Sequence, residues 1–149
     1  MIYISHRGNL DGRNVEKEND PMYITRAIQH GFSVEVDVWY KNNDFYLGHD
    51  EPKYRMPDLD FFRDDKLWCH AKNIDALNEM SKQNIHCFWH QEDDVTLTSK
   101  GYIWTYPGKK LKSKSVVVKP ENYIEKWWKH KFEKISGICS DYIERYVHD

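Results

Sequence analysis

Two acidic side chains stand two residues apart in the run Ser33-Val-Glu-Val-Asp-Val-Trp39. Side chains alternate between the two faces of a strand, so Glu35 and Asp37 would share one face and the valines the other. In a parallel sheet both faces are normally buried, and two buried carboxylates repel each other and lose hydration. A bound cation would offset both costs. The same alternation also fits a strand with one face in solvent, and in that case the two acids form no site.

Two histidines flank this acidic pair. His6 begins the segment His6-Arg7-Gly8 at the end of a first apolar strand, and His49 lies in Leu47-Gly48-His49-Asp50 after a hairpin-like turn at 41–44. The carboxyl ends of parallel strands gather at one end of a barrel, so we expect both imidazoles at the same mouth. With an ordinary pKa of about 6.5, histidine can give or take a proton near neutral pH. A lone histidine is more often structural, so the functional interpretation depends on the ordered set.

Four short signatures occur in order over the first third of the chain. They are His6-Arg7-Gly8, Glu18-Asn19 before a predicted helix, Glu35-Val-Asp37 and Leu47-Gly48-His49-Asp50. Together they resemble the N-terminal signature of the glycerophosphodiester phosphodiesterases, a family of the phospholipase-C-like phosphodiesterase superfamily. Weaker similarities follow at Ala71-Lys72 and at Gly137-Ile-Cys-Ser-Asp141. The chain would be a shortened member of that family.

This resemblance implies a hydrolase that uses a divalent cation, Mg²⁺ or Ca²⁺, together with two histidines. The residues implied are, for the metal, Glu35 and Asp37; for proton transfer, His6 and His49; and for phosphate contacts, Arg7 and Lys72. Such a set meets the needs of phosphodiester cleavage, because cations neutralise the phosphate and an acid protonates the departing alcohol. Which histidine acts as the acid stays open.

One position departs from the family pattern. The family usually has a carboxylate two residues before the lysine of the third strand, and His70 fills that place here. An imidazole ligand carries no negative charge and moves the preference of the site toward Mn²⁺, Zn²⁺ or Fe²⁺. In the alternative, His70 lines the pocket and binds no metal. Trp104, near the end of a later strand, is predicted to contact the substrate, because the face of a tryptophan would suit an alcohol or a choline-like group, although packing is the commoner role of such a residue.

Short β-branched and aromatic runs alternate with stretches of helical period, which is the pattern of parallel strands joined by crossover helices. The predicted strands are 2–6, 33–39, 67–71, 86–90, 101–105, 115–119 and 136–140. Helices are predicted after Asp20 and Asn73, which can cap them, and over 121–132. Segments 91–100 and 108–114 are too short for full crossovers. The 149 residues, taken as one domain, therefore predict an α/β fold, a shortened (β/α) barrel of the TIM type with several outer helices trimmed or missing.

The composition bounds the partners and the location. A formal net charge of -2 provides no basic field for nucleic acid. No segment approaches the roughly 18 apolar residues of a membrane span, and the first residues resemble a strand instead of an export leader. We therefore expect a cytoplasmic protein without a membrane anchor. Cys69, Cys87 and Cys139 are odd in number and lack paired spacing, which favours buried free thiols. The oligomeric state stays open.

The predicted function is metal-dependent hydrolysis of a small-molecule phosphodiester, in which a glycerophosphodiester is cleaved to an alcohol and a glycerol phosphate. Phospholipases C and sphingomyelinase-D-like enzymes of the same superfamily have a similar histidine pair, so they are alternatives for the substrate class. A non-catalytic module that binds a phosphate ester on the same fold is a further alternative, favoured by the missing helices and by His70. An accidental match in an ordinary α/β domain is disfavoured by the order and spacing of the four signatures.

Overall fold

The computed structural model describes residues 1–147, and these form one mixed β-sheet of ten strands with few helices. The strands are β1 (Ile2–His6), β2 (Ser33–Lys41), β3 (Asp44–Leu47), β4 (Tyr54–Met56), β5 (Leu67–Ala71), β6 (Cys87–Phe88), β7 (Val95–Leu97), β8 (Ile103–Thr105), β9 (Ser115–Val118) and β10 (Gly137–Ser140). The α-helices are α1 (Pro21–Gln29), α2 (Ile74–Lys82) and α3 (Ile143–Val147). Four short 3₁₀ segments are η1 (Leu59–Arg63), η2 (Pro120–Asn122), η3 (Glu125–Trp127) and η4 (Lys129–Lys134).

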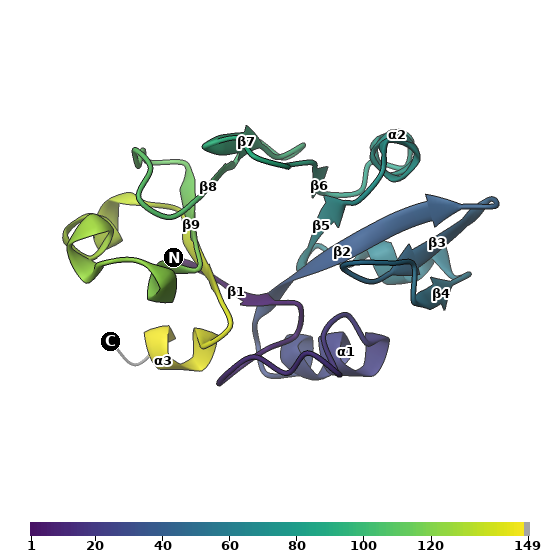
Figure 1. Cartoon of the computed structure of the whole chain (residues 1–149), viewed down its shortest axis with the longest axis horizontal. Helices are drawn as coiled ribbons and strands as arrows, with labels where there is room; N and C mark the ends of the chain where they lie inside the picture. The colour runs from purple at the N-terminus through teal and green to yellow at the C-terminus, as the bar shows by residue number, and fades with distance from the viewer. Residues whose placement is uncertain (148–149) are drawn as a thin grey trace.

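The sheet is parallel at its centre and antiparallel at its margins. β2, β1, β10, β9 and β8 form parallel pairs in that order, and β5 and β6 extend the parallel part from β2. β3 and β4 add an antiparallel extension to β2, and β7 pairs antiparallel with β8. The sheet curls round so that β6 and β7 lie opposite β1 (Figure 1). Within residues 1–147 no ladder joins β6 to β7, so the sheet is a curled half-barrel.

The predicted helix-rich (β/α) barrel of the TIM type is therefore wrong, and the reason lies in the connections. Segment 91–100 contains the antiparallel strand β7 instead of a crossover helix, and 108–114 joins β8 to β9 without a helix. The predicted helix over 121–132 is also wrong. That segment consists of 3₁₀ turns, which are interrupted where Tyr123 and Ile124 adopt extended backbone angles.

Other predictions of local structure are confirmed. Each of the seven predicted strands occurs, although β6 and β8 form shorter ladders than expected. Asp20 caps α1 by accepting a hydrogen bond from the Met22 N–H, with a proline at the first helical position. Asn73 caps α2 by accepting from the Ala76 N–H. The turn between β2 and β3 has two consecutive asparagines with positive φ, as a two-residue hairpin turn requires.

Hydroxyl groups bridge the margin between β6 and the segment after β7. The Ser99 hydroxyl accepts a hydrogen bond from the Cys87 N–H at 2.9 Å, and the Ser99 N–H donates to the Cys87 carbonyl at 2.8 Å. The Thr96 hydroxyl donates to the Trp89 carbonyl at 3.0 Å. These contacts satisfy backbone groups that a regular ladder would have paired.

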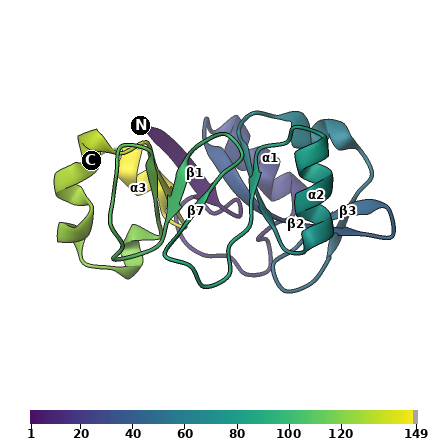
Figure 2. The same ribbon diagram turned by 90° about the horizontal axis from the view of Figure 1, so that it is seen from above.

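The two faces of β2 have different surroundings. Val34, Val36 and Val38 are fully buried in an outer core that includes residues of α1 and α2. Glu35 and Asp37 alternate with them and face the inside of the curl. Figure 2 shows α2 beside β2 at one end of the molecule and α3 near the N-terminus at the other. None of the helices within the described residues is long and apolar enough to cross a membrane.

Candidate metal and acid–base site

Residues in or just after seven strands, β1, β2, β3, β5, β6, β8 and β9, line one pocket of about 380 Å³. It is lined by His6, Arg7, Glu35, His49, His70, Lys72, Trp89, His90, Gln91, Trp104, Tyr106, Val118 and Lys119. The carboxyl ends of parallel strands in an open sheet are the usual place for such a cleft. Seven of the eight predicted site residues line this pocket, and the eighth, Asp37, is fully buried beside it.

Glu35, Asp37 and His70 form a compact cluster. Each offers one ligand atom, and these atoms lie within 4.8 Å of one another. The two carboxylates come from the inner face of β2, and ladder register with β5 puts His70 opposite Asp37. The His70 Nδ1 atom lies 3.6 Å from Glu35 Oε1 and 3.4 Å from Asp37 Oδ1. Both carboxylates are buried, with exposed fractions of 2% and 0%.

The second ring nitrogen of His70, Nε2, determines whether Nδ1 presents a lone pair or a proton to the two carboxylates. Its Nε2 atom lies 3.1 Å from the His90 carbonyl oxygen, which can only accept, so Nε2 carries a proton. In the neutral imidazole, Nδ1 then presents a lone pair to two carboxylates. Three acceptors so close together repel one another unless a cation or a proton lies between them. A metal-binding histidine usually donates its other N–H to a group of this kind.

Two buried carboxylate oxygens in the cluster have no hydrogen-bond partner among the described residues, Glu35 Oε2 and Asp37 Oδ1. Buried acceptors left in this state are uncommon, because the lost hydration is costly. His6 Nε2 is 3.7 Å from Glu35 Oε2, which is too distant for a hydrogen bond. Two anionic oxygens and one imidazole fit a divalent cation, and the nitrogen favours Mn²⁺, Zn²⁺ or Fe²⁺ over Ca²⁺ or Mg²⁺.

The surroundings of the two carboxylates set their pKa values apart. Burial alone would raise the pKa of Glu35, but a hydrogen bond from His70 when its Nδ1 carries a proton, together with the nearby charges of His6 and Arg7, outweighs it and lowers that pKa to about 2. Burial and the charge of Glu35 raise the pKa of Asp37, and the attraction of Arg7 only partly offsets them. Asp37 is therefore the carboxylate whose ionised form is less favoured, and a cation would relieve that cost.

Arg7 is held by acidic partners on one side. Its Nε lies 2.9 Å from Asp37 Oδ2, and its Nη1 donates to Glu18 Oε2 at 3.1 Å. Its backbone is left-handed, with a φ of 57°, which a non-glycine residue adopts only at an energetic cost. Gly8 follows with a φ of 93°, and a Cβ there would lie 2.6 Å from the Tyr23 ring. The turn after β1 thus fixes the guanidinium between the acids and the pocket.

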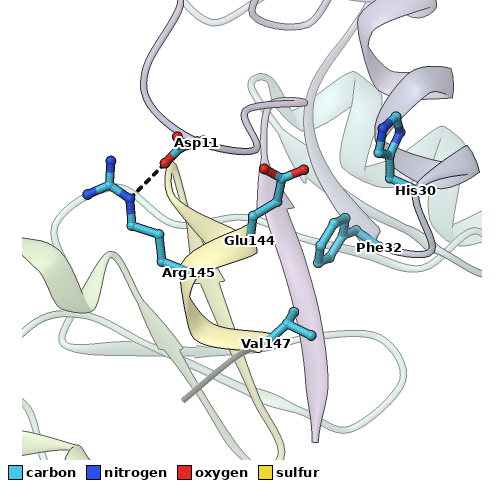
Figure 3. A pocket seen from close by; sticks show the side chains of 6 residues that line it. All are labelled: Asp11, His30, Phe32, Glu144, Arg145 and Val147. Atoms are coloured by element: carbon cyan, nitrogen blue, oxygen red, sulfur yellow. Dashed lines mark hydrogen bonds and ion pairs between the residues drawn. The ribbon is translucent and has the colours of Figure 1, made fainter.

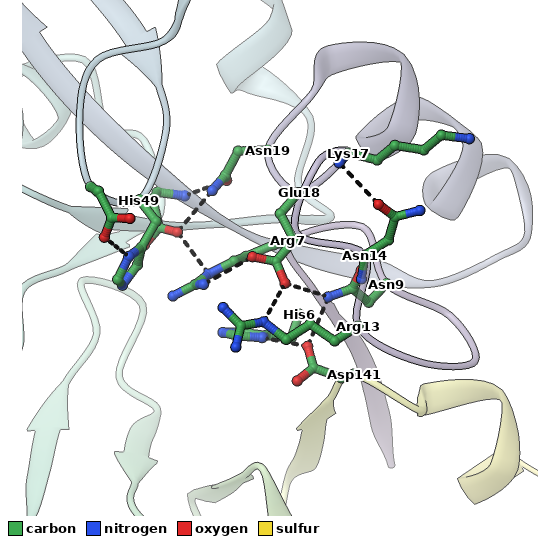
Figure 4. Close-up of polar contacts among 12 residues, drawn as sticks. His6, Arg7, Asn9, Arg13, Asn14, Lys17, Glu18, Asn19, His49 and Asp141 are labelled. Atoms are coloured by element: carbon green, nitrogen blue, oxygen red, sulfur yellow. Dashed lines mark hydrogen bonds and ion pairs between the residues drawn. The ribbon is translucent and has the colours of Figure 1, made fainter.

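His6 is oriented by Asp141, which follows β10. The carboxylate Oδ1 lies 2.7 Å from His6 Nδ1, and it also accepts a hydrogen bond from Asn9 at 2.8 Å. Burial would raise the pKa of Asp141, but His6, Asn9 and Lys119 outweigh it and hold that pKa well below its usual range. The ionised Asp141 carboxylate contacts the Nδ1 side of the His6 ring, so the Nε2 atom faces Glu35 and the pocket. Figure 4 shows this grouping of His6, Asn9 and Asp141.

His49 has a more open setting than His6. Its side chain is 43% exposed, and its Nδ1 lies 2.6 Å from the carboxylate of Asp50, which is almost fully in solvent. Gly48 fixes the backbone before it, because a Cβ at that position would overlap the Glu51 carbonyl oxygen. In Figure 4, His49 lies apart from the cluster around His6. Of the two histidines predicted for proton transfer, His6 is therefore buried and His49 exposed, although both line the pocket.

Lys72 and Trp104 both line the pocket but differ in how much of the side chain is free to contact a ligand. Lys72 lines it, and no acidic group of the described residues lies within 4.0 Å of its ammonium. Trp104 is only 2% exposed, and its ring packs 4.7 Å from that of Phe88. The tryptophan therefore acts mainly as packing and offers little of its face to a ligand, which limits the predicted contact with the alcohol.

Sequence reasoning missed Lys119 and Asn9 and gave Asp141 only a secondary place. Lys119 follows β9 in a left-handed conformation, with its Nζ 3.3 Å from Asp141 Oδ2. Its position at the end of a predicted strand was the available signal, since neighbouring strand ends supply the other site residues. Asn9 gave no comparable signal, because its role depends on a turn that brings it to Asp141 and Glu18.

A second depression lies on another part of the surface. It has a volume of about 610 Å³ and is lined by Asp11, His30, Phe32, Glu144, Arg145 and Val147 (Figure 3). Arg145 Nε pairs with Asp11 Oδ1 at 2.7 Å. Within residues 1–147, the only group of histidine, cysteine and acidic side chains close enough to hold a metal is Glu35, Asp37 and His70. No predicted site residue lines this second depression.

Comparisons of the chain with protein-family models, with curated proteins and with solved structures give no match. The resemblance to the phosphodiesterase signature therefore rests on the short motifs alone. The arguments for a function come from those motifs and from the geometry of the pocket.

Proposed function

We propose that this protein is a metal-dependent phosphodiester hydrolase that cleaves glycerophosphodiesters to an alcohol and glycerol phosphate. One observation carries the proposal: His6, His49 and Lys72 line one pocket beside a cluster suited to a divalent cation, and among the described residues the Lys72 ammonium has no acidic partner within 4.0 Å. A phosphodiester needs such a set, because its negative charge repels nucleophiles and its alkoxide leaves poorly without a proton.

Glu35, Asp37 and His70 would hold the cation. When bound, the cation supplies neutralisation of the charge on the phosphate oxygens. Lys72 adds a positive charge that has no acidic partner within 4.0 Å among the described residues. Arg7 contacts Asp37 through its Nε and Glu18 through its Nη1, so Nη2 is the nitrogen of its guanidinium that would contact the phosphate.

The two histidines are suited to different steps of proton transfer. Asp141 holds the proton of His6 on Nδ1, so Nε2 is free to accept a proton from the attacking hydroxyl or water. His49 is exposed at the mouth and can exchange protons with water. We assign the base to His6 and the acid that protonates the leaving alcohol to His49.

The test uses bis-(p-nitrophenyl) phosphate and glycerophosphoglycerol, each with added Mn²⁺. Replacing His49 by Ala should lower kcat by about 10²- to 10⁴-fold, as for loss of a general acid. Because the His49 side chain is exposed, the variant should unfold at the temperature of the parent. His30→Ala is the matched control, since His30 lies on a different part of the surface. Equal activity in His49→Ala and the parent would refute the assignment.

A non-catalytic module that binds phosphate esters is the second candidate. It is favoured by the open setting of His49, whose partner Asp50 is 91% exposed and gives it little fixed orientation. Binding of a glycerophosphodiester without turnover, in protein shown to contain metal, would support this candidate. Phospholipase C and sphingomyelinase-D-like activities stay as alternatives for the substrate, and a choline-lipid substrate would distinguish them. The cytoplasmic location is part of the proposal and is supported by three free buried cysteines.

A further inference from the structure

The charge of the chain is unevenly distributed along its length. Segment 108–134 contains nine lysines and three glutamates, whereas the whole chain has 22 Lys+Arg against 24 Asp+Glu, so the rest of the chain is acidic. The segment spans the connections from β8 to β9 and from β9 to β10. In Figure 1 its yellow-green turns lie at the opposite end of the molecule from α2 and β3. A basic end on an otherwise acidic chain is typical of a surface that binds an anionic partner.

Two aromatic rings and an exposed isoleucine lie beside the loop that follows β8. The Trp127 indole N–H donates to the Lys109 carbonyl at 2.6 Å, and its ring lies 5.6 Å from that of Tyr123. The Tyr123 ring also packs against Gly108, where a Cβ would come within 2.9 Å of it. Tyr123 is 47% exposed, and Ile124, which follows it directly, is 65% exposed. We define the basic apolar patch as these three side chains with the nearby lysines: Tyr123, Ile124, Trp127, Lys109, Lys110 and Lys126.

The lysines of the basic apolar patch are exposed and only partly neutralised. Lys109 pairs with Asp94 at 2.8 Å. Lys110 and Lys126 are exposed, and among residues 1–147 no acidic group lies within 4.0 Å of either ammonium. Glu125, next to the patch, pairs with a lysine outside it, Lys129, at 3.6 Å. Positive charge is therefore left over beside exposed apolar side chains.

An anionic lipid surface fits this combination better than two other partners. A second copy of the chain, bound about a two-fold axis, would bring the lysines of one patch against those of the other. Single-stranded nucleic acid is held by stacking on open aromatic faces, but the most exposed apolar side chain here is the aliphatic Ile124, which offers no face for stacking. A bilayer interface accepts aliphatic, Tyr and Trp side chains, and its anionic headgroups attract lysines.

We infer that the basic apolar patch binds the surface of an anionic membrane, with Ile124 and Tyr123 at the boundary between headgroups and acyl chains and the lysines near the lipid phosphates. Such binding is peripheral and reversible, and it needs no membrane-spanning helix. The inference goes beyond the proposed phosphodiesterase function and does not depend on it, because no residue of the patch lines the pocket.

The experiment measures how much of the full chain sediments with lipid vesicles in the presence of a chelator, which prevents a metal from bridging protein and lipid. Vesicles of phosphatidylcholine with about 30% phosphatidylserine are compared with vesicles of phosphatidylcholine alone. The parent should bind the anionic vesicles at least roughly 30-fold more tightly, as for two lysines near an anionic surface. Raising the ionic strength from about 0.1 M to about 1 M should remove this preference, because the Debye length falls from about 10 Å to about 3 Å.

Two variants test the two components of the patch. Replacing both Lys110 and Lys126 by Gln should weaken binding to the anionic vesicles by roughly 30-fold. Ile124→Ser should weaken it by roughly tenfold, as for the loss of a buried aliphatic side chain.

Each variant has a matched control outside segment 108–134. Replacing both Lys17 and Lys41 by Gln removes two exposed lysines elsewhere, and Ile74→Ser removes an isoleucine that is 60% exposed on α2. Both control proteins should bind the vesicles as the parent does.

Equal binding of the parent to anionic and neutral vesicles, or binding to neither, would overturn the inference. Full binding by both patch variants would also overturn it, because the contact would then lie elsewhere on the chain. Binding of a single-stranded oligonucleotide without binding of vesicles would overturn it in favour of nucleic acid. None of these measurements involves turnover, so the comparison of His49→Ala with the parent decides the phosphodiesterase function separately.

Discussion

Replacing Asp37 by Asn should abolish metal binding while it changes the stability of the metal-free protein only a little. The ligand atoms of Asp37 and Glu35 lie within 4.8 Å of each other, and two unit charges at that separation repel by about 3.5 kcal/mol at an effective dielectric constant of 20. The Asn19 amide and Arg7 act in the opposite direction. Burial first, and then the charge of Glu35, raise the pKa of Asp37. The ionised side chain is therefore destabilised more by burial and Glu35 than it is stabilised by its attractive partners. The metal-free variant should therefore unfold within about 1 kcal/mol of the parent.

The response to metal should differ strongly between the two proteins. At a Mn²⁺ concentration 100 times Kd, binding to the folded state alone stabilises the parent by about 2.7 kcal/mol. For a chain of this size, that corresponds to a rise in Tm of about 5–10 °C. Asp37→Asn loses an anionic ligand, so its Tm should not rise at the same concentration. Scanning calorimetry of chelator-treated protein, with and without Mn²⁺, measures both quantities.

Asp60→Asn provides the control for this experiment. Asp60 is 85% exposed and lies outside the cation cluster, so this variant should keep the full metal response of the parent. An Asp37→Asn protein whose Tm rises with Mn²⁺ as much as that of the parent would refute the assigned site. A parent whose Tm does not change with Mn²⁺, Zn²⁺ or Mg²⁺ would show that a proton on His70, and not a metal, balances the two carboxylates.

Two further predictions concern the side of the sheet around β6. Burial lowers the pKa of His86 to about 4, because the folded protein favours the neutral imidazole. The contribution of His86 to the unfolding free energy is therefore fully present above the ordinary pKa near 6.5 and is lost as the pH falls from 6.5 to 4. Between pH 7 and pH 5 the parent should lose about 1–2 kcal/mol more unfolding free energy than His86→Gln, as measured by urea denaturation at both pH values, and parallel losses would contradict this. Ser99→Ala leaves the Cys87 N–H without its 2.9 Å acceptor and should cost about 1–3 kcal/mol, against less than about 0.5 kcal/mol for the exposed Ser113→Ala. Equal urea midpoints for these two serine variants would show that the Ser99 hydroxyl does not stabilise the contact between β6 and the segment after β7.

Local elements were predictable because their signals are local. Asp20 with the following proline, and Asn73 before an apolar stripe, specify helix starts through contacts only a few residues away. Strands such as β9, with all four residues buried, appear in the sequence as short β-branched runs. The direction of pairing was not predictable in the same way. Whether β7 pairs antiparallel with β8 depends on contacts across the sheet, and a three-residue strand with two exposed positions gives almost no pattern.

The site was more predictable than the fold around it. Alternation in β2 was enough to put Glu35 and Asp37 on one face, and strand ends gave His6, Lys72 and His70. The sequence could not show that Arg7 would be tied to two acids, because Glu18 reaches it through an irregular loop. It also could not show that Trp104 would be covered by Phe88, since that packing joins side chains from two separate strands.

The small number of outer helices is compatible with such a site for a physical reason. The residues of the pocket come from strand ends on the inner side, whereas helices α1 and α2 cover the valine face of β2 on the outer side. The strands that hold the cation cluster, β2 and β5, keep that cover, and Ala27 and Met80 beneath them are fully buried. Within the part of the chain that the structure describes, the side with β7 and β8 has no such helix and is bridged by hydroxyl groups instead. The half-barrel is therefore best covered at β2 and β5, where the candidate cation cluster lies, and least regular at the margin between β6 and β7.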